Sequence, residues 1–324
     1  MYKLSLTLLS AILLLFNGYS QKDTLSKNDK AALDSMIKND EFLKMLDKDK
    51  VSRVDVSIGI GNGSFSGDNP AVNATGVTNQ VVITPALFYH HKSGLSIGIS
   101  PFFTKDSSKM VLYQTGLTGS YDYYGKDVNA GISYTRYLSD GNKYNNKSLY
   151  QNDIFGYIKK AKGLIQPGAS IGYASGKYKE VDLVTFTPPP PAQPIPRLVR
   201  DSTNNKTSYF SFSASAEHDF SWYNVFDKND EFDLVPSLII NTGSDKNAVT
   251  HTNRLYDRLS KLSNRKRVTE NNKFQLQSIA ASLDITYTIG KFYLQPNIYV
   301  DYYLPSTTAK RLSSIFSLVA GISF

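Results

Sequence analysis

Six carboxylate side chains stand on the polar side of segments in which polar and apolar residues alternate. The six are Asp55, Asp122, Glu217, Asp219, Asp284 and Asp301. Because successive residues of a β-strand point to opposite faces, these carboxylates would share the face opposite to the apolar residues. Acids at comparable depth in a water-filled pore would favour cations over anions. The alternative is that they lie near the rims or pair with basic residues of loops that fold inward.

The four histidines do not predict a metal site. His90 and His91 are adjacent, so on a strand they would point to opposite faces, while His218 and His251 lie far along the chain. The chain has no cysteine, no zinc-ligand spacing and no glycine fingerprint typical of nucleotide binding. We therefore expect no metal and no cofactor, and we interpret His218 as a residue at a strand end.

Residues 91–94, His-Lys-Ser-Gly, resemble the His-x-Ser-x-Gly neighbourhood of outer-membrane phospholipases. The resemblance would assign Ser93 as the nucleophile and His91 as the base. The Asn that the motif has after the Ser is missing, since Gly94 follows directly, and these residue types are also common in turns without any chemistry. The sequence therefore favours a turn, and we do not expect the protein to be an enzyme.

The elements that would hold these residues are strands. From residue 51 onward apolar residues occur at every second position, as in Val54, Val56, Ile58 and Ile60. The pattern predicts twelve strands: Val54–Ile60, Val81–His90, Leu95–Phe103, Val111–Tyr124, Val128–Tyr137, Asp153–Ile158, Ile165–Ala174, Tyr209–Phe220, Phe232–Asn241, Gln275–Ile289, Phe292–Tyr303 and Ser314–Phe324. Many approach the roughly 9 to 11 residues that a membrane-crossing strand needs.

Three further features favour lipid rather than water outside the strands. The polar face carries small side chains such as Ser282 and Thr286, and aromatic residues gather at strand ends, as in Phe102 and Phe103, where a girdle would meet lipid headgroups. Expected connections alternate between short and long. The sequence therefore predicts an all-β, transmembrane, antiparallel up-and-down β-barrel of about twelve strands over residues 51–324.

The first fifty residues differ from the rest. Lys3, an apolar stretch over residues 4–16 and small residues at Gly18 and Ser20 predict a signal peptide over residues 1–20, cleaved between Ser20 and Gln21. Residues 21–50 are charged, with apolar residues at helical spacing. They predict a short periplasmic helical tail, which is either solvated or docks on a partner or in the barrel mouth.

The last strand carries the most specific resemblance. Residues 314–324, SIFSLVAGISF, place Phe316, Leu318, Ala320, Ile322 and Phe324 on one face and end on an aromatic residue. This looks like the terminal strand of bacterial outer-membrane barrels, which the resemblance implies is recognised by the barrel-assembly machinery. The signal segment ending in Gly-Tyr-Ser is similar to those of the uncharacterised barrels of Bacteroidota. The resemblance implies location in the cell outer membrane.

Two long outer loops are expected, over residues 177–206 and 242–273. The first has six prolines in residues 188–196, which favour a stiff polyproline segment. The second carries a basic patch: Arg254, Arg258, Lys261, Arg265, Lys266 and Arg267. The patch could meet anionic lipopolysaccharide or an acidic ligand, or be a solvated loop. Nucleic acid is not expected, because Tyr256 is the only aromatic residue interleaved with these basic residues.

These features suggest three functions. The first is a passive pore for small solutes, in which the two outer loops restrict access. The second is a structural or accessory barrel whose loops and N-terminal helix bind other envelope proteins. The third is an outer-membrane lipid hydrolase.

Overall fold

The computed structural model describes residues 51–63, 77–106, 109–139, 150–186, 197–251, 269–271, 273–304 and 311–324. The described part is built of β-strands, and it has no helix that is long and apolar enough to span a membrane. The strands are β1 (Arg53–Gly63), β2 (Val77–His90), β3 (Leu95–Asp106), β4 (Lys109–Tyr124), β5 (Val128–Leu138), β6 (Asn152–Lys160), β7 (Gln166–Phe186), β8 (Arg197–Glu217), β9 (Phe220–Tyr223), β10 (Asp230–His251), β11 (Thr269–Asn271), β12 (Gln275–Ile289), β13 (Phe292–Tyr303) and β14 (Leu312–Ser323).

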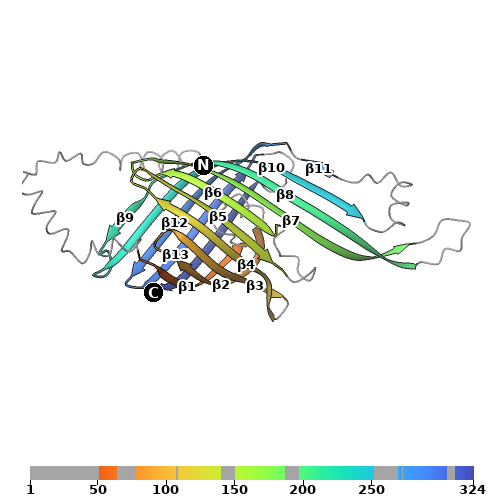
Figure 1. Cartoon of the computed structure of the whole chain (residues 1–324), viewed down its shortest axis with the longest axis horizontal. Coiled ribbons are helices and arrows are strands. Elements are labelled where there is room, and N and C mark those ends of the chain that lie inside the picture. Colours follow the sequence, from red (N-terminus) through yellow and green to blue (C-terminus); the bar gives the residue numbers. More distant parts are fainter. Residues whose placement is uncertain are drawn as a thin grey trace, which may run out of the picture. The chain divides into compact units, whose positions relative to one another are not determined.

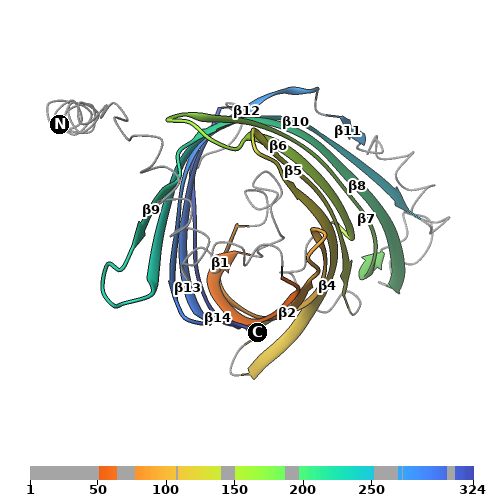
Figure 2. The same cartoon turned by 60° about the vertical axis from the view of Figure 1, so that its left-hand side comes forward.

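Twelve of the strands form a closed antiparallel ring (Figures 1 and 2). Each strand from β1 to β8 pairs with the next, β8 pairs with β10, and β10 continues through β12, β13 and β14. β14 pairs with β1 and so closes the barrel. Strands β9 and β11 pair with β10 and are additional to the ring. The prediction of a twelve-stranded antiparallel barrel is confirmed.

The two faces of the wall differ in chemistry, as alternation requires. Large apolar side chains point outward and are exposed, including Ile97, Ile132, Leu238 and Phe316. The alternate positions point inward and are mostly polar, as Ser278, Ser282, Asp284 and Thr286 do on β12. A closed barrel that is apolar outside and polar inside is the arrangement of a membrane-spanning β-barrel.

The two ends of the barrel also differ. At one end, the short-turn end, strands are joined by residues 91–94, 125–127, 161–165 and 290–291. The opposite end, the long-loop end, carries the connections that leave β1, β3, β5, β7, β10 and β13. Both chain ends of the barrel, at Arg53 and Phe324, lie at the short-turn end, because β1 and β14 pair there.

The expected outer loops are shorter than the sequence predicted. β7, β8 and β10 have 21, 21 and 22 residues, so that residues 177–186, 197–206 and 242–251 are strand rather than loop. A membrane needs only roughly 9 to 11 residues per strand. The extra length is stabilised by backbone pairing of β8 with both neighbours, which continues to Phe186↔Arg197 on one side and to Thr203↔His251 on the other.

A strand boundary and the orientation of one side chain differ from the prediction. The expected strand Tyr209–Phe220 is broken at His218 and Asp219, after which β9 continues along the same edge of β10. Phe102, predicted in the outer girdle, points inward and is only 2 % exposed. The signal peptide at residues 1–20, the helical tail at 21–50 and the proline-rich residues 188–196 lie outside the described residues.

Candidate functional site

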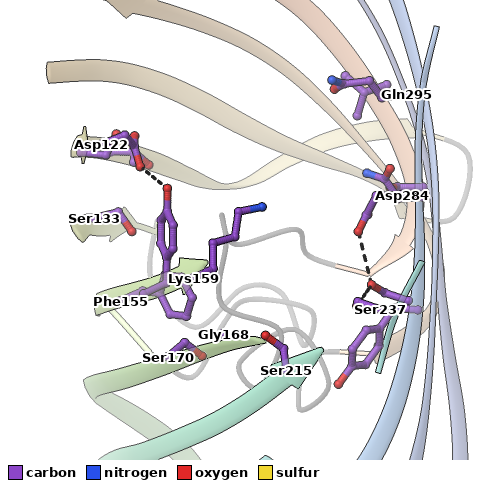
Figure 3. A pocket seen from close by; sticks show the side chains of 18 of the residues that line it. Asp122, Ser133, Phe155, Lys159, Gly168, Ser170, Ser215, Ser237, Asp284 and Gln295 are labelled. Atoms are coloured by element: carbon purple, nitrogen blue, oxygen red, sulfur yellow. Dashed lines mark hydrogen bonds between the residues drawn. The ribbon is translucent and has the colours of Figure 1, made fainter. Parts of the chain in front are cut away.

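The barrel encloses a cavity of about 1060 Å³. Every strand of the ring from β1 to β8, and β10, β12, β13 and β14, contributes a side chain to its wall. Ten serine residues line it, among them Ser133, Ser170, Ser215 and Ser237 (Figure 3). Their hydroxyl groups both donate and accept hydrogen bonds, so the wall can replace part of the hydration shell of a polar solute.

Five of the six carboxylates singled out in the sequence line this cavity: Asp55, Asp122, Glu217, Asp219 and Asp284. Lys159 is the only lysine or arginine among the lining residues, and His90 is the only histidine. Asp301 does not line the cavity, although it lies on the inward face of β13. It is 4 % exposed, and the hydroxyl group of Tyr299 donates a hydrogen bond to it at 3.4 Å.

Asp55 is the most fully compensated of these acids. Its Oδ2 atom lies 3.3 Å from Arg53 Nε and 3.1 Å from His90 Nε2, and Ser323 Oγ donates to its Oδ1 at 2.5 Å. His90 Nδ1 in turn lies 2.8 Å from Ser96 Oγ. The cluster ties β14, β1, β2 and β3 together. Asp55 is thus paired, but with residues of the barrel wall and not with loop residues.

Asp122 accepts a hydrogen bond from the hydroxyl group of Tyr157 at 2.9 Å. Gly131, on the strand between them, makes room for this contact, because a Cβ atom there would lie 2.4 Å from both Asp122 Oδ1 and Tyr157 Cε1. Such distances are well inside van der Waals contact. The glycine therefore allows a carboxylate on β4 to meet a phenol on β6 across β5.

Glu217, Lys159 and Asp284 form the most charged part of the wall. Lys159 Nζ donates to Glu217 Oε1 at 2.5 Å. Asp284 accepts from Ser282 Oγ at 3.3 Å, and the hydroxyl groups of Ser282 and Ser237 are 2.7 Å apart. Figure 3 shows Asp284 and Ser237 facing Lys159 across the cavity.

Side chains pack closely in another part of the interior. One buried cluster consists of Val82, Phe102, Tyr113 and Tyr137, and a second of Tyr150, Ala174 and Tyr209. Register shifts turn a residue inward on two strands: Tyr113 and Gln114 are both buried on β4, and Gln277 and Ser278 are both buried on β12. These clusters narrow the interior.

The sequence does not single out these aromatic residues as an inner cluster. Phe102 shares the phase of Ser100 and Thr104, so alternation alone places it inside. The alternating pattern therefore already indicated that Phe102 points inward. Tyr113 had no such signal, because a β-bulge changes the phase within its strand.

An asparagine joins the strands beside the second cluster. Asn241 accepts from Ser213 Oγ at 2.7 Å and donates to Ser278 Oγ and Tyr299 Oη, both at 3.1 Å. Tyr209 donates to Gln277 Oε1. A buried polar network with its partners in place fixes the side chains that form it.

His91 and Ser93 lie in the turn between β2 and β3. Their side chains are 2.8 Å apart, and the same His91 Nδ1 atom accepts the backbone N–H of Ser93 at 3.2 Å. Gly94 follows with φ at +92°, which only glycine adopts easily. The contact is thus part of a tight turn.

Histidines and acids elsewhere in the described chain do not gather in a group of three that could hold a metal ion. His218 lies at the break between β8 and β9, where its ring stands edge-on to that of Phe220, with 4.2 Å between the two ring centroids. His251 ends β10. The basic patch Arg254, Arg258, Lys261, Arg265, Lys266 and Arg267 lies outside the described residues.

Comparisons with known proteins give only distant likenesses. No family model matches the chain, and no curated protein matches it by sequence. The NanC porin is similar over 84% of this chain and 98% of its own, with 13% identity and a TM-score of 0.33. The outer membrane channel DcaP of Acinetobacter baumannii is similar over 84% and 96%, with 10% identity and a TM-score of 0.23. OprB of Pseudomonas putida covers 87% of this chain and 96% of its own, with 8% identity and a TM-score of 0.23.

Proposed function

We propose that the protein is an outer-membrane β-barrel that acts as a passive, cation-favouring pore for small solutes. The observation that carries the proposal is the acidic wall of the cavity. Five carboxylates line it against one lysine, and Arg53 pairs with Asp55 just outside the lining, so the net charge of these groups is 2 − 5 = −3 when the acids are ionised and His90 is neutral. A water-filled passage with this lining attracts cations and repels anions.

The location in the outer membrane is part of this proposal. It is supported by the apolar outer face of the barrel and by the export signal expected over residues 1–20. The same proposal has Phe324, which is 61 % exposed, guide insertion by the barrel-assembly machinery. The basic residues of the second outer loop would meet anionic lipopolysaccharide.

No catalytic role is proposed. His91 and Ser93 are close, but one atom, His91 Nδ1, contacts both the hydroxyl group and the backbone N–H of Ser93. Such contacts between residues two positions apart stabilise a turn.

A second candidate, an accessory barrel of an envelope complex, is favoured by one observation. The buried aromatic clusters around Phe102 and Tyr209 narrow the interior, and a barrel filled by side chains passes no solute. The two candidates differ in one measurable property, which is conductance.

The test is conductance of the purified barrel in a planar lipid bilayer. We expect discrete channels whose reversal potential in a KCl gradient lies on the potassium side. The selectivity should weaken between about 0.1 M and about 1 M salt, because the screening length falls from about 10 Å to about 3 Å. Absence of channels at all voltages and salt concentrations would contradict the pore and support the accessory barrel.

A matched pair of variants tests the acidic wall itself. The double variant Asp122→Asn/Asp219→Asn removes two charges from the cavity and should move the reversal potential toward the chloride side. Asp127→Asn/Asp227→Asn removes two charges from turns and should leave it unchanged. Equal effects of the two double variants would argue against selectivity by the cavity lining.

A further inference from the structure

The ion pair between Lys159 and Glu217 joins strands that are not neighbours. Lys159 is the last residue but one of β6 and Glu217 is the last residue of β8, and β7 lies between these two strands. Gly168 of β7 is the residue that pairs with Lys159 on one side and with Ser215 on the other. The lysine side chain therefore passes over a glycine on its way to the carboxylate.

Gly168 has no room for a side chain. A Cβ atom there would lie 2.6 Å from Ser215 Oγ and 3.3 Å from Lys159 Cβ. The absence of this atom lets the lysine stem lie against β7 and brings its ammonium group within 2.5 Å of Glu217. The local structure thus holds the ammonium group at the cavity wall.

The facing wall carries a second acid. This acid is Asp284 of β12, and Figure 3 shows the ammonium group of Lys159 projecting into the cavity toward it. Ser215, Ser237 and Ser282 supply hydroxyl groups around the same space. Two carboxylates and several hydroxyl groups are oxygen ligands of the kind that inorganic cations take. The ammonium group of Lys159 lies against one of these carboxylates, that of Glu217.

We infer that Lys159 is a tethered counter-ion: its ammonium group occupies a cation site formed by Glu217 and Asp284 and so limits how strongly the pore favours mobile cations. The inference rests on the proposed pore function and names the residue that sets its selectivity. A mobile cation must displace a positive charge that is attached to the wall. If the charge of Lys159 is removed, a cation from solution can bind to both carboxylates.

The variant that tests this is Lys159→Met, because methionine has a flexible unbranched side chain without charge. The matched control is Lys160→Met, since Lys160 is the next residue and its side chain is exposed on the opposite face of the same strand. Lys159→Arg keeps the charge at the same place. All three should fold, as judged by the shift in gel mobility between the unheated and the heated protein.

We expect the permeability ratio of potassium to chloride to rise several-fold in Lys159→Met and to stay at the wild-type value in Lys160→Met and Lys159→Arg. Magnesium ions should reduce the potassium conductance of Lys159→Met much more than that of the wild type. This block should disappear in Lys159→Met/Asp284→Asn, because one of the two carboxylates is then neutral. A block that persists in the double variant would overturn the paired acid site.

Failure of the inference and failure of the pore give different results. If the wild type conducts and Lys159→Met behaves as Lys160→Met does, the pore stands and the role of Lys159 is wrong. Equilibrium binding of magnesium ions to the purified barrel, measured by calorimetry, needs no conductance. Binding to Lys159→Met but not to Lys160→Met supports the site even if no channel forms, and equal binding to both overturns it.

Discussion

Asp230 shows how one residue fixes a connection that carries exposed aromatic side chains. It is 2 % exposed, and its carboxylate accepts the backbone N–H groups of Val225, Phe226 and Asp227 at 2.7–2.9 Å. The hydroxyl group of Tyr287 adds a fourth bond at 3.1 Å. Burial disfavours the ionised form, but the bonds from Phe226, Asp227 and Val225 outweigh it, so the pKa of Asp230 lies below its ordinary value.

The lowered pKa predicts a pH dependence of stability. A carboxylate whose pKa is lower in the folded than in the unfolded protein stabilises the fold above the unfolded value of about 3.9, and this contribution is lost as the pH falls through the folded value. We expect Asp230→Asn to lower the urea midpoint of unfolding at neutral pH, and the gap to the wild type to shrink below about pH 4. Asp127→Asn, in the turn between β4 and β5, is the control and should change little at either pH.

The same turn explains why two asparagines stand where they do. Asn224 and Asn229 have positive φ angles of 56° and 71°, and the Asn224 side chain accepts the backbone N–H of Asn229 at 2.8 Å. Asparagine tolerates the left-handed conformation better than most residues, because its side chain bonds to nearby backbone. A tight turn at this point therefore depends on residue type as well as on the strands that it joins.

At the scale of elements, the decisive contact is that between the first and last strands. β1 and β14 pair in register from Asp55↔Ser323 to Gly61↔Ser317. Val54 and Phe324 exchange two backbone hydrogen bonds of 3.0 and 2.9 Å at the end of the seam. The bond from Ser323 Oγ to Asp55 adds a side-chain contact to a charged group. Closure removes both free edges of the sheet, which would otherwise be open to other chains.

The seam can be weakened by one hydroxyl group. Ser323→Ala should destabilise the barrel by about 1.5–3 kcal/mol, the usual range for a hydrogen bond to a charged group. The control is Ser314→Ala on the same strand, where the side chain is exposed. Urea unfolding in lipid vesicles, followed by gel mobility, measures both. Equal midpoints for the two variants would show that the side-chain bond does not contribute to closure.

On the scale of the whole molecule, the outer and inner faces of one strand lie in different solvents. Ile132 of β5 points outward and is 57 % exposed, whereas its neighbour Ser133 lines the cavity. If the outer face meets lipid, charge is costly there and tolerated inside. The cost of a charge therefore differs between these adjacent residues because one faces lipid and the other faces the cavity.

A lysine at each of these positions measures this difference. Ile132→Lys should cost about 2–4 kcal/mol if its depth is near the middle of the bilayer, because a charged side chain is then exposed to lipid. Ser133→Lys should cost much less, since its charge faces a polar cavity. Unfolding by urea in lipid vesicles gives both values, and a larger cost for Ser133→Lys would mean that the two faces have been assigned the wrong way round.

The positions of the strands and the apolar face of each can be read from the amino-acid sequence alone. Alternation with period two is a local property, so it can be read without knowing what a strand pairs with. The twelve ring strands and the inward phase of Asp122, Glu217 and Asp284 follow from it. The terminal segment ending at Phe324 was predicted as a strand for the same reason.

The register, the strand lengths at the long-loop end and the partners of each charge depend on the folded barrel. These depend on pairing between distant segments, as when Lys159 reaches Glu217 over Gly168 or when Asp55 meets His90 and Ser323. Residues 197–206 carry few strand formers, and their strand conformation comes from backbone bonds to β7 and β10. Alternation assigns a residue to a face, whereas a charge is compensated only by what long-range pairing brings within a few ångströms.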